Sequence, residues 1–270
     1  MSIPHLSGKL IQVSSPSPHV LLVELARAPV NAFNKPFWVE YGKVFEKISR
    51  EQDVRAVVLA SSLPKVFSAG LDFSALSEFQ TFDSDIGRRA VQTRDFILEF
   101  QHAVSAPERC PIPVIIAIHG VAYGLPIDIL GACDEVDIGL ASDIGTLARL
   151  PKLTGNQSLV HELAYTARPF SANEAEKMGL VSKVVEGGRD EVVKAALETA
   201  KVIAAKSPIA IVGTKRTLLH SRDHTVQENL EYVATWNAAM LHSTDVAESI
   251  KAAQAKKRVT YKPLGRSAKL

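Results

Sequence analysis

The chain has 270 residues, 46% hydrophobic and 22% charged, so it can bury a large core and is not disordered over most of its length. Lysine and arginine total 31 against 29 acidic residues, and a net charge of +2 favours no polyanion such as nucleic acid as partner. The longest apolar run, residues 114–118, is too short to cross a bilayer. We therefore expect a small-molecule partner, with no nucleic acid and no membrane.

The first half of the chain alternates extended and helical patterns. Apolar runs predict strands at 10–13, 20–25, 55–60 and 114–118, and Pro and Ser residues at 14–18 predict a turn between the first two. Asn34 followed by Pro36 predicts the start of a helix that ends before Asp53, and a second helix is expected inside 84–108. Strands that alternate with helices favour a mostly parallel sheet covered by helices, which is an α/β fold.

From about residue 156 the pattern is helical almost throughout. Helices are expected at 156–166, 172–178, 190–206, 208–219, 226–241 and 245–255, and only 180–185 has an extended pattern. Capping boxes at Ser171 to Glu174 and Thr225 to Glu228 mark two of the starts. We expect an α/β core at 1–155 and a helical region at 156–270 that is not independent of it, since no long linker separates them.

Common reaction centres are missing from the sequence. There is no G-x-S-x-G elbow, no phosphate-binding G-x-x-x-x-G-K-[ST], no G-x-G-x-x-G after a strand and no H-E-x-x-H. The eight histidines are scattered singly, which argues against zinc. No metal or redox cofactor is expected.

Two turns could instead present backbone N–H groups to a ligand. One is 67–72, where a strand ends in small residues and a glycine, and the other is 119–128, where a strand runs through glycines into an expected helix. Either alone fits an ordinary strand-to-helix turn. Together they could hold one carbonyl oxygen.

An acidic cluster follows the second turn. Asp128, Asp134, Glu135, Asp137 and Asp143 lie in a stretch that is otherwise largely apolar. Two carboxyls in one low-dielectric pocket separate in pKa, which leaves one as an acid and the other as a base. The spacing does not fit a calcium loop, and for Asp134 and Asp137 a position on a surface loop remains an alternative.

Four segments carry a resemblance to a known family. They are 67–72 (FSAGLD), 135–152, 155–168 and 221–224 (SRDH). The first resembles the crotonase (enoyl-CoA hydratase/isomerase) superfamily at large, and the others resemble its Δ3,5-Δ2,4-dienoyl-CoA isomerase branch. The resemblance implies a spiral of ββα repeats, a helical C-terminal region used for trimers and often hexamers, and an acyl-CoA substrate, with coenzyme A part of that substrate.

The resemblance also assigns roles to residues. The backbone N–H groups of Ala69 and Leu125 would form an oxyanion hole, Glu135 would be the base at C2, Asp143 the acid at C6, and Asp128 an orienting group. Further positions implied in substrate binding are Ser68, Gly70, Leu71, Asp72 and Gly124. Two carboxylates and two N–H donors suffice to move a 3,5-diene to a 2,4-diene.

One departure from the family pattern affects the site. Asp134 is joined directly to Glu135. In members of the branch, a strand, a turn and another extended run separate the two residues that correspond to this pair. We expect this shortened junction to reduce stability or turnover. The alternatives are an enoyl-CoA hydratase, which the Asp128 and Asp143 pattern disfavours, and a non-catalytic acyl-CoA-binding homologue.

The chain ends in Ala268-Lys269-Leu270, after a basic stretch. This tripeptide differs by one small residue from the Ser-Lys-Leu address that the peroxisomal import receptor binds. The sequence therefore predicts a peroxisomal location, and a basic tail without a targeting role is the alternative.

Overall fold

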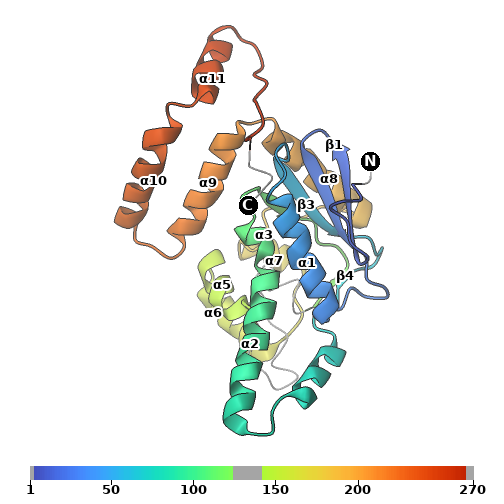
Figure 1. Ribbon diagram of the computed structural model, residues 1–270. Coiled ribbons are helices and arrows are strands. Elements are labelled where there is room, and N and C mark those ends of the chain that lie inside the picture. Colours follow the sequence, from blue (N-terminus) through green and yellow to red (C-terminus); the bar gives the residue numbers. More distant parts are fainter. Residues whose placement is uncertain (1–2, 124–141, 266–270) are drawn as a thin grey trace.

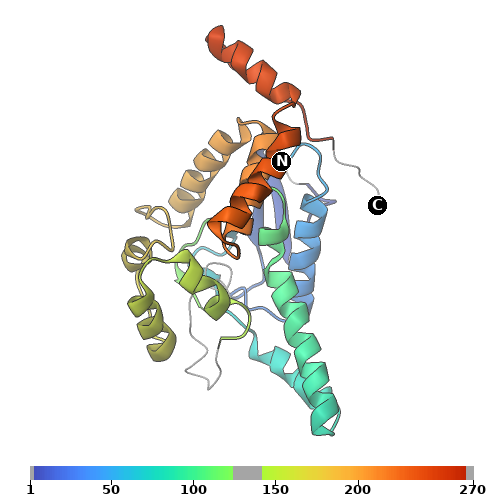
Figure 2. The same cartoon turned by 90° about the vertical axis from the view of Figure 1, so that its left-hand side faces the viewer.

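The computed structural model describes residues 3–123 and 142–265, and Figures 1 and 2 show it in two views. A four-stranded sheet has the order β1-β2-β3-β5, formed by Ile11–Ser17, Val20–Leu25, Ala56–Ser61 and Val114–Ile116. β1 and β2 are antiparallel, and β2, β3 and β5 are parallel. The predicted mostly parallel sheet is confirmed.

The central strand β3 is buried on both faces. Its residues alternate between two apolar clusters, with Val57 and Leu59 in one and Ala56, Val58 and Ala60 in the other. This alternation follows from the two-residue period of a strand. Each face of the sheet therefore needs its own helical cover.

Helices α1 (Lys35–Ile48) and α2 (Ile86–Val104) cover the first face. The Asn34 side chain caps α1 by accepting the Phe37 N–H, as predicted. The two helices join through aromatic rings, and the Trp38 ring stacks on that of Phe100 with centroids 4.1 Å apart. These large side chains form the main core.

Helix α8 (Arg189–Ala204) covers the second face of the sheet. Its side chains Val193, Ala196, Ala200 and Ala204 pack on the apolar residues of β2 and β3. Figure 2 shows the strands lying between α8 and α1. A helix from the second half of the chain therefore completes the core that the first half begins.

The remaining elements are shorter or lie outside this layered core. They are β4 (Val66–Ser68), the 3-10 helix η1 (Phe73–Thr81), α3 (Ala106–Arg109), β6 (Val121–Ala122), α5 (Thr146–Leu153), α6 (Gln157–Thr166), α7 (Ala172–Lys177), α9 (Pro208–Ser221), α10 (Val226–Met240) and α11 (Thr244–Gln254). In Figure 1, α10 and α11 project away from the sheet.

The predicted strands and helices are found with ends shifted by a few residues. Both capping boxes are present. The prediction of an extended segment at 180–185 was wrong, because the structure has no strand there. No helix among the described residues is both long and apolar enough to span a membrane.

Candidate active site

The two predicted N–H turns come together through a small parallel sheet. β6 pairs with β4, Val66 lies opposite Val121, and the Tyr123 N–H donates to the Ser68 carbonyl at 3.0 Å. Gly120 permits this approach, because a Cβ there would lie 2.1 Å from the Lys65 carbonyl oxygen. The chain entering the second turn therefore runs beside the first, while Gly124 and Leu125 lie outside the described residues.

The structure corrects the expected oxyanion donor on the first turn. The Ala69 N–H already donates to the Val30 carbonyl oxygen at 2.9 Å, so it is not directed at a ligand. An isolated parallel bridge joins Phe33 to Leu71, in which the Phe33 N–H donates to Gly70 O at 2.7 Å and the Asp72 N–H donates to Phe33 O at 3.0 Å.

This bridge determines where the next amide points. In a parallel bridge, the residue opposite Phe33 directs its own N–H and C=O away from Phe33. The Leu71 N–H has no hydrogen-bond acceptor among the described residues. Leu71 is half-buried and follows Gly70, whose φ of +81° turns the chain at this point. Leu71 is therefore the residue of this turn that can offer a donor to a ligand.

The Asn31 side chain holds the 67–72 turn in place, a role that was not predicted from the sequence. Its side chain is fully buried, and Nδ2 donates to Ser61 Oγ at 2.8 Å and Phe67 O at 2.9 Å. Its Oδ1 accepts the Arg27 N–H at 2.7 Å. The φ of Asn31 is +49°, a left-handed conformation that asparagine tolerates better than most residues.

Two side chains of the turn are engaged in holding it. Ser68 is buried, and its Oγ donates to Asn31 O at 2.7 Å and accepts the Gly70 N–H at 3.1 Å. Asp72 pairs with Arg27 at 2.7 Å and caps η1, and its hydrogen bond with Ser74 is the largest cause that lowers its pKa. Both side chains are therefore used within the turn, and their role in substrate binding stays a prediction.

Among the predicted acids, the structure describes Asp143. It is exposed and lies just before α5, and its carbonyl accepts a hydrogen bond from Gln101 Nε2 at 2.5 Å. Asp128, Asp134, Glu135 and Asp137 lie outside the described residues. The pairing of Glu135 and Asp143 as base and acid stays a prediction.

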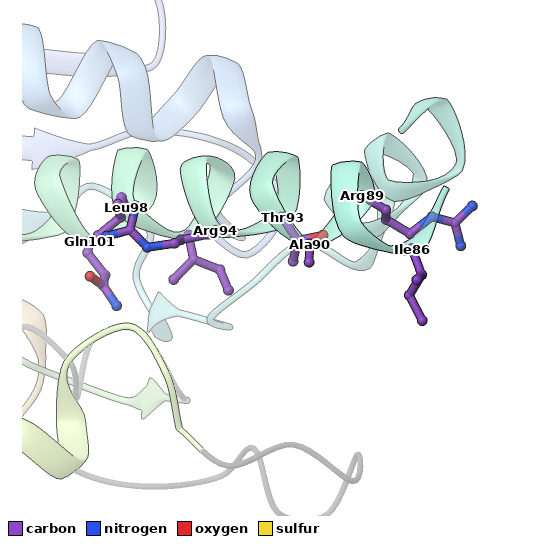
Figure 3. Close-up of a pocket in the computed structure, with 8 residues that line it drawn as sticks. Ile86, Arg89, Ala90, Thr93, Arg94, Leu98 and Gln101 are labelled. Carbon is purple, nitrogen blue, oxygen red and sulfur yellow. The ribbon is translucent and has the colours of Figure 1, made fainter. Parts of the chain in front are cut away.

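Asp143 lines a cavity of about 670 Å³ between the end of α2, the start of α5 and the turn after α9. A second cavity of about 530 Å³ follows α2 toward its N-terminus, and Figure 3 shows its lining side chains along one side of that helix. Leu98 and Gln101 line both cavities. Within residues 3–123 and 142–265, no three His, Cys, Asp or Glu side chains gather as a metal site.

Comparison with known proteins gives consistent results. The Enoyl-CoA hydratase/isomerase family matches residues 17–263. The mitochondrial Δ(3,5)-Δ(2,4)-dienoyl-CoA isomerase of Rattus norvegicus is 44% identical over 263 residues, covering 92% of this chain and 80% of the rat protein. The peroxisomal enzyme of the same name from Arabidopsis thaliana is 39% identical over 251 residues, covering 87% of this chain and 89% of its own.

The length of the rat alignment bears on the shortened junction. Since 92% of 270 residues is about 248, the 263 aligned positions include about 15 with a residue only in the rat protein. A gap of this size agrees with the length of a missing strand-turn-strand piece.

Solved structures share the fold. The crystal structure of enoyl-CoA hydratase from Bacillus anthracis superposes with a TM-score of 0.82 at 27% identity, over 94% of this chain and 99% of that one. The family match, the sequence relatives and the fold agree over nearly the whole length, and the chain belongs to the enoyl-CoA hydratase/isomerase family, the crotonase superfamily.

Proposed function

We propose that this protein isomerises 3,5-dienoyl-CoA to 2,4-dienoyl-CoA in fatty-acid β-oxidation. The observation that carries the proposal is the 44% identity to the rat dienoyl-CoA isomerase over 92% of the chain. The fold alone does not choose among acyl-CoA reactions, because one fold can serve several chemistries. The enoyl-CoA hydratase of similar fold is only 27% identical.

The proposed reaction needs two proton transfers. Glu135 removes a proton from C2, the charge spreads through the thioester enolate and the diene, and Asp143 returns a proton at C6. Asp128 orients or polarises the site. Asp143 suits contact with a bound acyl chain because its exposed side chain lines the cavity beside α5. General acid and base groups of this kind each contribute roughly 10²- to 10⁴-fold in rate.

The enolate oxygen needs hydrogen-bond donors while it carries charge. We assign this role to the Leu71 N–H in place of Ala69, together with the Leu125 N–H on the second turn. Support comes from the pairing of β4 with β6, which brings the chain that leads to Leu125 beside the first turn. Each donor contributes about 3 kcal/mol to transition-state stabilisation.

The shortened junction favours a second candidate function. With Asp134 joined directly to Glu135, the base is displaced unless the neighbouring chain is rebuilt, and a displacement of about 1 Å can cost roughly 100-fold in rate. We expect turnover below that of relatives with the intact segment. The second candidate function is therefore acyl-CoA binding without conversion of the substrate.

One experiment separates these functions. The purified protein is incubated with a 3,5-dienoyl-CoA and, separately, with a 2-enoyl-CoA, while the absorbance of the conjugated thioester is followed. Isomerisation raises the absorbance of the first substrate, and hydration lowers that of the second. Binding of both thioesters by calorimetry with no change in either would identify the non-catalytic homologue.

We further propose a peroxisomal location and assembly into homotrimers or hexamers. The tripeptide Ala268-Lys269-Leu270 supports the first, through the import receptor, and relatives carry both mitochondrial and peroxisomal names. For assembly, no side chain of α10 is buried, and Val226 and Leu230 are 78% and 59% exposed. Removal of the last three residues should abolish import, and sedimentation of the purified protein gives the oligomer mass.

A further inference from the structure

Two of the segments that resemble the isomerase branch meet in space. Arg149 and Lys152 lie on α5, and Arg222 and Asp223 lie on the turn between α9 and α10, about 70 residues later in the chain. All four line the cavity that also holds Asp143. The proposed reaction gives these residues no role, so their meeting needs its own explanation.

The turn that bears Asp143 is held on two sides. Gln101 Nε2 donates to the Asp143 carbonyl, and Figure 3 shows Gln101 on the side of α2 that faces the start of α5. The Arg149 guanidinium lies over the same turn, because a Cβ on Gly145 would be 1.7 Å from Arg149 Nη1. A residue larger than glycine at position 145 would displace either the turn or this guanidinium.

Residues at the junction of α2 and α3 hold the Arg149 guanidinium in place. Its Nη2 donates to Ser105 Oγ at 2.6 Å, and its Nε pairs with Glu108 Oε2 at 3.1 Å. The other carboxylate oxygen of Glu108 pairs with Arg222. The Arg149, Glu108 and Arg222 side chains are only 22%, 29% and 24% exposed, so these pairs are less screened by solvent than surface pairs.

This triad has two cations and one anion. The outer pair of Lys152 and Asp223 adds no net charge and is about half exposed, so it contributes little. The other charged or titratable groups that line the cavity in the described part of the chain are His102 on α2 and Asp143 itself. The triad therefore leaves one excess positive charge on the wall of this cavity.

We propose that Arg149 and Arg222, joined through Glu108, are positioning residues that fix the Asp143 turn and set the ionisation of its carboxyl for the proton transfer at C6. This inference rests on the proposed function. It gives the Ser221–His224 motif a purpose, since Arg222 brings the C-terminal helices into contact with the wall of the site. The three side chains act through the Asp143 turn and need not touch the substrate.

The test compares pH profiles of kcat for the isomerisation of a 3,5-dienoyl-CoA. If Asp143 is the acid, the rate falls as the pH rises through its pKa. Arg222→Met removes a cation, so the pH at which the rate falls should increase. Glu108→Gln removes an anion, so the pH at which the rate falls should decrease. Each shift should be about 0.5 unit, as expected for the loss of one charge from the wall of a partly solvated site.

Three further variants complete the design. Arg222→Lys keeps the charge and should restore the pH at which the rate falls. Arg149→Met loosens the turn as well, so kcat should fall about 10-fold with little change in KM. Lys201→Met, which removes the cation of an exposed α8 pair far from the cavity, is the matched control and should change neither value.

The outcomes separate the two proposals. Opposite shifts for Arg222→Met and Glu108→Gln, with rescue by Arg222→Lys, would support the positioning role. Equal losses of rate with no opposite shift would overturn it, provided that Asp143→Asn is inactive. If Asp143→Asn keeps the parental rate, the acid assignment in the proposed function has failed, and the inference fails with it.

Discussion

Asn31 offers a direct test of how the first N–H turn is held. Its amide group joins the ends of β2, β3 and β4 through Arg27, Ser61 and Phe67. Its carbonyl accepts from Ser68 Oγ, and Ser68 in turn holds Gly70. Substitution of Asn31 should therefore both destabilise the protein and loosen the turn that presents the Leu71 N–H.

The expected loss follows from these contacts. Asn31→Ala removes three hydrogen bonds of 2.7–2.9 Å in a fully buried site, each about 1 kcal/mol. Alanine at a φ of +49° adds about 1–2 kcal/mol of backbone strain. The free energy of unfolding should fall by about 4–5 kcal/mol for Asn31→Ala and by about 3 kcal/mol for Asn31→Gly, since glycine adopts this conformation without strain.

Guanidinium denaturation of the parent and both variants measures these differences, and kcat for isomerisation gives the effect on the turn. Asn31→Gly should keep the fold and lose more kcat than a surface variant of equal stability. A loss of stability below 1 kcal/mol for both variants, or parental kcat in Asn31→Gly, would show that Asn31 does not organise the turn.

Three further predictions address the site and the packing of the helical region. Leu71→Pro removes one N–H and should lower kcat by about 10²- to 10³-fold with a folded protein by circular dichroism, and a similar rate in both proteins would exclude Leu71 as a donor. Glu135→Gln and Asp143→Asn should each lower kcat by at least about 10²-fold with acyl-CoA affinity unchanged by calorimetry, and retained turnover in either would remove that residue from the mechanism. Lys215 on α9 is largely buried and donates to the carbonyls of Pro107, Cys110 and Ile112 at 2.6–2.9 Å, and burial lowers its pKa to about 8. Because the unfolded chain binds the extra proton between pH 8 and about 10.5, the free energy of unfolding should rise with pH in this window, by at most about 3 kcal/mol. Lys215→Met should lack this rise in denaturation curves, and equal pH dependence in the two proteins would contradict it.

The regular elements were predictable because their signals are local. The cap of α1 at Asn34, the capping boxes at Ser171 and Thr225, and the apolar runs of β2 and β3 each depend on residues close in sequence. β4 and β6 were missed because they have three and two residues and pair over more than 50 positions. Segments this short carry no readable period.

For the first N–H turn, the motif could be predicted but the donor atom could not. The 67–72 motif marked the turn, but the Ala69 amide is bonded inside the protein, and the choice between Ala69 and Leu71 depends on the bridge to Phe33, which local sequence does not encode. Asn31 gave a weaker signal, since its partners Ser61 and Phe67 lie 30 and 36 residues away. An asparagine at a tight turn could have been flagged, but its partners could not have been named.

Deuterium labelling of the product tests the central claim most directly. The purified protein is incubated with a 3,5-dienoyl-CoA in D₂O, and the product is analysed by NMR. If one carboxyl removes the C2 proton and another, equilibrated with solvent, protonates C6, the product is 2,4-dienoyl-CoA with one deuterium at C6. Product that carries the original C2 proton at C6, or recovery of unchanged substrate, would contradict the two-carboxylate account.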